Sequence, residues 1–230
     1  MSIVAPPRQL AFALPHAESL SREDFLDGPC NAAALTLIES WPDWPNRIMM
    51  LAGAEGAGKS HLAAIWAAMA GARSTAAHSL TAASVPAELA TGALVVEDIS
   101  ADSVDERALF HLLNLAREQQ AYVLMTSRRP PAALDVGLRD LRSRLRAIPV
   151  VTVDQPDDHL FRALIIKFSA DRQMHLDETV VSYLASRIER SFAAARLAVE
   201  RLDEESLRLR RPVTRALAAE VLRRTDGAEV

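Results

Sequence analysis

One short stretch constrains this chain more than any other. An apolar run, Ile48–Leu51, leads into Gly-Ala-Glu-Gly-Ala-Gly-Lys-Ser at residues 53–60, and an alanine-rich helical pattern follows. The spacing G-x-x-x-x-G-K-S, placed between a strand and a helix, is the Walker A pattern of a phosphate-binding loop. Glycine allows the sharp backbone turns that aim N–H groups at phosphate oxygens. The three glycines of this loop are Gly53, Gly56 and Gly58.

The residues that close the loop supply the remaining chemistry. Lys59 places a positive charge near the terminal phosphates, and Ser60 offers a hydroxyl to Mg²⁺. The helix that follows presents its positive N-terminal end to the same anion. We therefore expect ADP or ATP with Mg²⁺ at this loop, with His61 as a further contact.

Length, charge and cysteine content limit the class of protein. A chain of 230 residues is long enough for a core domain and a smaller second one. Its net charge of −4 argues against a basic, sequence-specific DNA binder. The lone Cys30 cannot form an internal disulfide, and we find no membrane-length apolar run or signal-peptide order. We expect a cytoplasmic protein with no membrane association.

Apolar runs alternate with helical patterns over residues 21–155, which predicts parallel strands between helical layers. The fold class is therefore α/β, with a nucleotide-binding domain of the P-loop type. The predicted strands are Arg47–Ala52, a weak Ser74–Ala77, Ala93–Asp98, Ala121–Met125 and Pro149–Val153. The predicted helices are Asn31–Ser40, Lys59–Ala70, Val104–Gln119 and part of Leu134–Leu145.

The pattern changes near Pro156. Residues 156–230 show helical periods and no strand, which predicts a small all-helical lid domain. Asp157, Asp177 and Thr214 each precede a helical pattern and are suitable N-cap residues. The predicted helices are Asp157–Ala170, Asp177–Ile188, Phe192–Arg208 and Thr214–Arg223.

Residues 1–20 read as a mostly extended arm that contains a short apolar segment. Leu10, Phe12 and Leu14 alternate, which is compatible with strand-like packing on the chain's own core. The same segment, beginning at Gln9, could instead be a linear motif presented to a partner. The residues alone do not choose between these two interpretations.

A pair of carboxylates ends the strand predicted over Ala93–Asp98. Glu97 and Asp98 stand where a Walker B pattern places a group that holds Mg²⁺ and a group that activates the attacking water. We assign Glu97 to the metal and both residues to catalysis. A solvated acidic turn is the alternative.

Two further groups of polar residues could have either a structural or a nucleotide-contacting role. Thr126 and Ser127 end the next strand, where they could touch the terminal phosphate or serve as ordinary strand-end hydroxyls. Arg142, Arg144 and Arg146 alternate, and they form either a solvated basic face or an arginine finger that reaches a neighbouring subunit's nucleotide.

With these pieces in place, the chain resembles the AAA+ ATPases, and more closely their DnaA-like clade, over about residues 20–224. The segments that carry the resemblance are Phe25–Asn31, Thr126–Pro131 and Leu141–Leu145. They are similar to that clade's adenine-pocket segment, sensor 1 and arginine-finger box. The resemblance implies that Phe25 lines the adenine pocket and that Arg144 is the finger.

The arm and the expected end of the chain after the lid refine this resemblance. A Gln-Leu-x-Phe arm ahead of a DnaA-like core, with no helix-turn-helix reader behind it, resembles the Hda family of DnaA-related regulators. That resemblance implies that Gln9, Leu10 and Phe12 anchor the chain on the DNA polymerase III sliding clamp. It also implies that Arg144 acts in trans on DnaA, stimulating hydrolysis of DnaA-bound ATP and so repressing re-initiation of chromosome replication.

Two departures concern catalysis. The family's lid arginine, sensor 2, aligns with Ala193, with Arg190 and Arg196 one turn to either side as candidate nucleotide contacts. The acidic pair also runs Glu97 then Asp98, the reverse of the usual order. We therefore expect slow hydrolysis by the chain itself.

Other functions remain open at this stage. An autonomous AAA+ ATPase, such as a helicase loader or another replication accessory factor, is the main alternative. A DNA-binding initiator fragment is disfavoured by the acidic balance. The sequence does not decide whether the chain forms a homo-oligomer.

Overall fold

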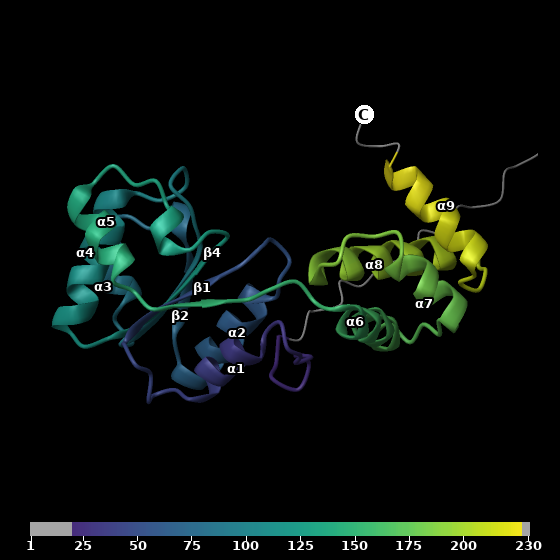
Figure 1. Cartoon of the computed structure of the whole chain (residues 1–230), viewed down its shortest axis with the longest axis horizontal. Helices are drawn as coiled ribbons and strands as arrows, with labels where there is room; N and C mark the ends of the chain where they lie inside the picture. The colour runs from purple at the N-terminus through teal and green to yellow at the C-terminus, as the bar shows by residue number, and fades with distance from the viewer. Residues whose placement is uncertain (1–19, 227–230) are drawn as a thin grey trace, which may run out of the picture. The chain divides into compact units, whose positions relative to one another are not determined.

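The computed structural model describes residues 20–226, which form two compact units (Figure 1). The sheet unit consists of residues 20–161 together with 190–194. The helical unit consists, within the described part, of residues 162–189 and 195–226. Among the described residues, no helix combines the length and the apolar character needed to cross a membrane.

The sheet unit contains five parallel strands in the order β2-β3-β4-β1-β5. All five residues of β1 are buried, because helices cover both faces of the sheet (Figure 1). The strand bounds are β1 Ile48–Ala52, β2 Arg73–Ala76, β3 Ala93–Ile99, β4 Tyr122–Ser127 and β5 Val150–Thr152.

Two apolar clusters fill the two sides of the sheet. Alternate strand residues divide between them, so that Met50 joins the cluster of α4 and α5, whereas Met49 and Leu51 join that of α1 and α2. The helices of this unit are α1 Ala32–Glu39, α2 Lys59–Ala70, α3 Val85–Glu88, α4 Glu106–Glu118 and α5 Arg139–Arg146, with short 3₁₀ helices at Ala77–Ser79 and Pro131–Ala133.

The helical unit is built from two whole helices and most of two others. Helix α7 packs against α9. The buried residues of these two helices include Val180 and Leu184 of α7 and Val221 of α9. The helix bounds are α6 Asp158–Asp171, α7 Glu178–Ala185, α8 Phe192–Leu209 and α9 Arg215–Asp226.

The three predicted N-caps are confirmed by hydrogen bonds. Asp157 accepts from the Leu160 N–H at 2.8 Å, and Asp177 accepts from the Val180 N–H at 2.9 Å. The Thr214 hydroxyl accepts from the Leu217 N–H at 3.3 Å. Each side chain satisfies a donor that the first turn of a helix leaves unpaired.

Strand β3 is one residue longer than predicted. The sequence indicates a strand over Ala93–Asp98 that carries both carboxylates at its end, and the structure extends this strand to Ile99. A register shift between Val96 and Ile99 interrupts its pairing with β4, and Asp98 adopts a φ of 58° there. Hydrophobicity cannot reveal this bulge, because it arises from pairing with β4.

Candidate functional site

The loop between β1 and α2 has the backbone shape that its glycines allow. Gly56 and Gly58 have φ values of +70° and +92°, in the left-handed region that side chains resist. A Cβ added to Gly53 would lie 2.2 Å from the Val153 carbonyl oxygen, because the loop runs close to the end of β5. All three predicted glycines are therefore required by geometry.

Lys59 lies beneath this loop as the first residue of α2. It is buried, and its Nζ donates hydrogen bonds of 2.8 Å to the carbonyl oxygens of both Gly53 and Ala54. Burial lowers the pKa of Lys59, while the nearby Asp98 carboxylate acts in the opposite direction. The loop thus surrounds one partly desolvated positive charge.

Residues 191–193, which belong to the sheet unit, contact the same loop. The Phe192 N–H donates to the Gly56 carbonyl at 2.8 Å. A Cβ on Gly56 would lie 2.8 Å from the Cβ of Ala193, the position where the resemblance leads us to look for an arginine. An uncharged methyl group therefore packs against the loop at this point.

The two arginines near Ala193 have other contacts. Arg190 forms an ion pair with Asp158 at 3.3 Å. The Arg196 guanidinium lies over the Phe168 ring, 5.4 Å from its centroid, within the helical unit. A nucleotide contact by Arg190 or Arg196 stays a prediction.

The bulge in β3 presents Asp98 at the carboxyl end of the sheet. The Asp98 N–H donates to the Thr126 hydroxyl at 3.0 Å, and the Ser103 hydroxyl donates to the Asp98 carbonyl at 3.1 Å. The Asp98 side chain is exposed, whereas Glu97 is half-buried within the strand. The backbone is thus pinned on both sides while the carboxylate stays accessible.

The strand-end hydroxyls Thr126 and Ser127 both bond to backbone. In addition to the Thr126 contact, the Ser127 hydroxyl donates to the Ile99 carbonyl at 2.8 Å and accepts from the Arg129 N–H at 3.2 Å. Both side chains are fully buried. They fasten β4 to the bulge in β3, and a direct phosphate contact by either stays a prediction.

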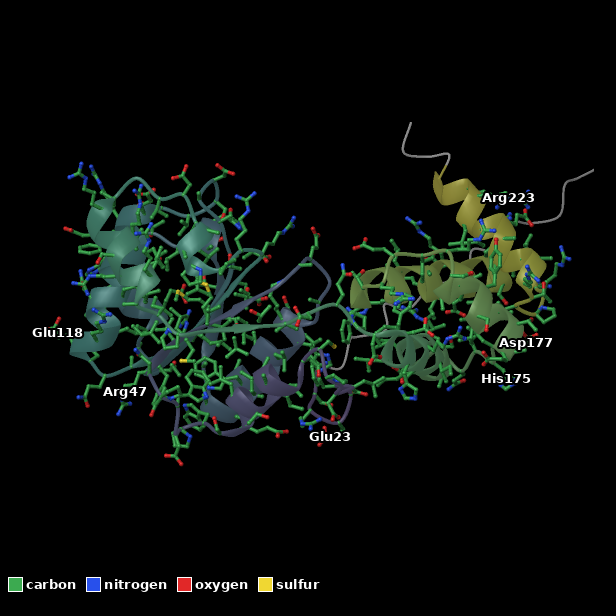
Figure 2. The ribbon with its side chains drawn as sticks, in the orientation of Figure 1. Glu23, Arg47, Glu118, His175, Asp177 and Arg223 are labelled. Carbon is green, nitrogen blue, oxygen red and sulfur yellow. The ribbon has the colours of Figure 1, made fainter. Side chains whose placement is uncertain are left out.

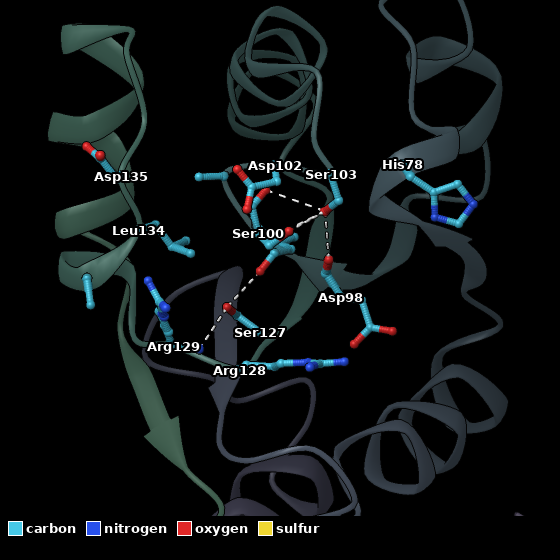
Figure 3. A pocket seen from close by; sticks show the side chains of 13 residues that line it. His78, Asp98, Ser100, Asp102, Ser103, Ser127, Arg128, Arg129, Leu134 and Asp135 are labelled. Carbon is cyan, nitrogen blue, oxygen red and sulfur yellow. Dashed lines mark hydrogen bonds between the residues drawn. The ribbon is translucent and has the colours of Figure 1, made fainter. Parts of the chain in front are cut away.

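A cavity of about 640 Å³ opens beside these strand ends (Figure 3). Charged and hydroxyl side chains share its lining with apolar ones such as Leu134, so the space is mixed in character. Its lining residues are His78, Asp98, Ile99, Ser100, Ala101, Asp102, Ser103, Ser127, Arg128, Arg129, Ala133, Leu134 and Asp135.

Sequence reasoning missed an ion pair at this end of the sheet. Arg128, directly after β4, contacts Glu55 of the glycine-rich loop between β1 and α2 at 2.8 Å. The pair forms because β4 lies next to β1, a strand order that the sequence does not state. A charged residue directly after an apolar strand is the signal that could have drawn attention to Arg128.

The predicted adenine-pocket residue Phe25 and the predicted nucleotide contact His61 lie together near the start of α2. Phe25 is buried, and its ring meets that of His61 edge-on at 5.1 Å between centroids. His61 Nε2 lies 2.8 Å from the Ser21 carbonyl oxygen, which ties the entry segment to the helix. These contacts support the shape of the segment, and the adenine contact stays a prediction.

The three alternating arginines of α5 have different surroundings. Arg142 donates to the Val136 carbonyl, with Nε at 3.1 Å, and so supports its own loop. The half-buried Arg144 lies over the Phe110 ring at 5.0 Å, while Arg146 is exposed. The Phe110 ring limits the positions that the Arg144 side chain can take, but it does not bury the guanidinium.

Two predicted sets are not tested by the described residues. Gln9, Leu10 and Phe12 lie outside them. Within residues 20–226, no group of three or more His, Cys, Asp or Glu side chains gathers as a metal site. The assignment of Mg²⁺ to Ser60 and Glu97 therefore stays a prediction.

Comparisons with known proteins show which folds and domains this chain resembles. Residues 157–222 match the family model described as the lid domain of Hda. The chain is similar to domain III of the replication initiation protein DnaA from Thermotoga maritima, with 18% identity and a TM-score of 0.73, covering 89% of this chain and 95% of that one. This chain has the AAA+ fold, and its residues 157–222 are similar to the Hda lid domain.

Two further structures agree on the fold. AMPPCP-bound DnaA from Aquifex aeolicus matches with 22% identity and a TM-score of 0.62, covering 77% of this chain and 62% of that one. The Holliday junction branch migration motor RuvB from Thermotoga maritima matches with 17% identity and a TM-score of 0.71, covering 88% and 71%. The predicted α/β fold with a helical region after it is confirmed.

Proposed function

We propose that this chain is a nucleotide-binding, DnaA-related replication regulator. Bound to the replication sliding clamp, it stimulates hydrolysis of DnaA-bound ATP and so represses re-initiation. The observation that carries the proposal is the match of residues 157–222 to the Hda lid, joined to a sheet unit of DnaA-like fold.

The sheet unit has the residues to hold ADP or ATP. The loop carbonyls of Gly53 and Ala54 hold the Lys59 ammonium, and the candidate nucleotide contacts Phe25 and His61 meet at the start of the same helix. Solved DnaA bound to AMPPCP supports the same ligand class. The phosphate oxygens of such a nucleotide, bound with Mg²⁺, would accept hydrogen bonds from the Lys59 ammonium and the loop N–H groups.

Slow hydrolysis by the chain itself follows from its acidic pair. Glu97 is half-buried in β3, and the exposed Asp98 sits in a left-handed bulge after it. Their order reverses the family pattern, which changes the reach of both carboxylates. Ala193 brings no positive charge to the loop. These features suit a ligand that is held rather than rapidly consumed.

Arg144 is the residue through which the chain would act on DnaA. Its guanidinium is steadied by Phe110, is half-exposed and sits near the end of α5. An arginine supplied to a neighbouring nucleotide stabilises the charge that develops during phosphoryl transfer and is worth roughly 10³–10⁵ in rate.

The test is hydrolysis of DnaA-bound ATP in the presence of DNA-loaded clamp. We expect Arg144→Ala to abolish stimulation, while Arg146→Ala, which removes an exposed arginine two residues away, retains it. Both variants should bind this chain's own nucleotide normally. Full stimulation by Arg144→Ala would refute the finger assignment.

A second experiment separates the regulator from an autonomous ATPase. The double variant Gln9→Ala, Leu10→Ala should lose binding to purified clamp. Unchanged binding would remove the clamp from the proposal. Fast turnover by the isolated chain, lost in Lys59→Ala, would instead favour a helicase loader or a similar ATPase.

A further inference from the structure

Helix α5, which carries Arg144, is short and has no cap of its own. It spans Arg139–Arg146, and Leu138 at its N-cap position makes no side-chain capping hydrogen bond. A helix of this length is marginal by itself in water, because its first turn is costly to form and few hydrogen bonds follow it. The position of α5, and with it that of Arg144, therefore depends on contacts with neighbouring elements.

Glu106, the first residue of α4, supplies the missing cap from another helix. Its two carboxylate oxygens accept hydrogen bonds from the Gly137 N–H at 2.6 Å and from the Leu138 N–H at 2.7 Å. In an ordinary capping box, a glutamate of the same helix accepts from the N-cap N–H. Here the carboxylate comes from a residue 32 positions earlier in the chain than Leu138. Its negative charge also suits the positive N-terminal end of α5.

The same side of α4 also contacts Arg144. Phe110 lies one helical turn beyond Glu106, and residues four apart share a face of a helix. The Arg144 guanidinium lies over the Phe110 ring, 5.0 Å from its centroid. Helices α4 and α5 run side by side (Figure 1). Helix α4 therefore meets α5 at two points, one before its first residue and one at the candidate finger.

Apolar packing alone does not fix a short helix in place. Leu141 and Leu145 of α5 are fully buried in the apolar cluster, but apolar contacts have no preferred direction. Hydrogen bonds are directional, so a carboxylate that accepts two of them limits both the tilt and the sliding of the helix. The bond from Arg142 to the Val136 carbonyl lies within the α5 segment and moves with it. The Glu106 bonds instead tie that segment to α4.

We propose that Glu106 is a positioning residue, which holds the start of α5 against α4 and so aims Arg144 at the nucleotide of a neighbouring molecule. It acts through the backbone of residues 137 and 138, without contacting the nucleotide. A catalytic group misplaced by about 1 Å can lower a rate about a hundredfold. The inference rests on the finger assignment in the proposed function.

The first test measures hydrolysis of DnaA-bound ATP with DNA-loaded clamp, at increasing concentrations of the full chain. We expect Glu106→Ala to lower the maximal stimulated rate at least about tenfold, because α5 is then free to shift. The concentration that gives half-maximal stimulation should change less than about twofold, as expected when only a transition-state contact is lost. A rise in that concentration with an unchanged maximal rate would assign Glu106 to binding and overturn the inference.

Two conservative variants separate reach from charge. Glu106→Gln keeps the side-chain length and one acceptor oxygen, so it should retain part of the stimulation. Glu106→Asp keeps the charge but is one methylene shorter, so it cannot bridge both N–H groups and should resemble Glu106→Ala. The opposite order, an active Asp variant and an inactive Gln variant, would show that charge alone matters and would overturn the inference.

Two controls lie on the same helix. Figure 2 labels Glu118, an exposed acidic residue at the other end of α4, and Glu118→Ala should leave stimulation unchanged. Asp105 is the N-cap of α4 and accepts from the Arg107 and Ala108 N–H groups. Asp105→Ala should lower the urea midpoint but not the maximal stimulated rate. An equal loss of rate in Asp105→Ala and Glu106→Ala would assign the effect to the stability of α4 and overturn the inference.

Amide hydrogen exchange, followed by NMR on the full chain alone, tests the contact without DnaA. Glu106→Ala should speed exchange at Gly137 and Leu138, because their N–H groups lose their acceptor. Unchanged exchange, or faster exchange with a normal stimulated rate, would overturn the inference and leave the finger assignment intact. Full stimulation by Arg144→Ala would overturn the finger assignment, and this inference with it.

Discussion

The two units use the same unusual backbone conformation for different purposes. In the helical unit, Gln173 has a φ of 56° and lies just after α6, where a left-handed residue commonly ends a helix. In the sheet unit, Asp98 has a φ of 58° near the end of β3, and its carboxylate acts on Lys59 at the glycine-rich loop. Gln173 ends a helix, whereas Asp98 interrupts the regular pairing of β3 at the candidate site.

The units also differ in what stabilises them. Two apolar clusters and a buried sheet dominate the sheet unit. The helical unit adds ion pairs at its surface, including Arg172 with Glu200 at 3.3 Å and Arg224 with Glu205 at 2.7 Å. We therefore expect core substitutions to act strongly on both units and acid to act more on the helical one.

The largest effect should come from matched leucine truncations. Leu124→Ala in β4 and Leu184→Ala in α7 each remove a fully buried side chain and should cost about 2–5 kcal/mol. Trp41, Trp44 and Trp66 all lie in the sheet unit, so tryptophan fluorescence follows that unit in urea, while circular dichroism follows both. A fluorescence midpoint lowered by Leu184→Ala would show that the units unfold together.

A glycine pair should give the next largest effect. Gly56→Ala meets strained φ and a contact at 2.8 Å with Ala193, whereas Gly71→Ala meets strained φ only, with open space around it. We expect Gly71→Ala to cost about 1 kcal/mol and to leave nucleotide affinity unchanged. Gly56→Ala should cost more and weaken nucleotide binding, as measured by urea unfolding and calorimetry. Equal losses would contradict the close contact.

Replacing the left-handed residues with glycine sharpens the opening comparison. Gln173→Gly and Asp98→Gly should each relieve up to about 1 kcal/mol of backbone strain, seen as a higher midpoint in urea. Gln173→Gly should leave ATP turnover unchanged, whereas Asp98→Gly should reduce whatever turnover the chain has. Unaltered turnover in Asp98→Gly would remove its catalytic assignment.

The smallest effect concerns acid. Hydrogen bonding by Arg208 and then Arg224 lowers the pKa of Glu205 from 4.5 to about 2. A carboxyl with a lowered folded-state pKa stabilises the fold above its unfolded pKa, and this contribution is lost as the pH falls from about 4.5 towards 2. The melting temperature followed by circular dichroism should therefore decrease as the pH falls over that range.

The control for this acid effect is a pair of neighbouring substitutions. Glu205→Gln should flatten the pH dependence of the melting temperature, and Glu204→Gln at the exposed neighbouring position should not. A pH dependence that survives in Glu205→Gln would assign it to other carboxyls.

Elements set by short-range rules could be predicted from the sequence, whereas contacts set by strand order could not. The helix Lys59–Ala70 and the caps Asp157 and Asp177 were predictable, because motif and capping rules act over a few residues. The left-handed bulge at Asp98 and the ion pair of Arg128 were not. Both depend on which strands become neighbours, and one sequence does not specify that order.

The sequence by itself determined the shape of the glycine-rich loop between β1 and α2, since glycine spacing and the following lysine dictate local backbone shape and charge. It also determined where sheet gives way to helices. The tertiary structure alone decided that Thr126 holds the Asp98 backbone and that Arg128 reaches Glu55. The physical reason is that hydrogen bonds between parallel strands join residues far apart in the chain, and only their register brings such side chains together.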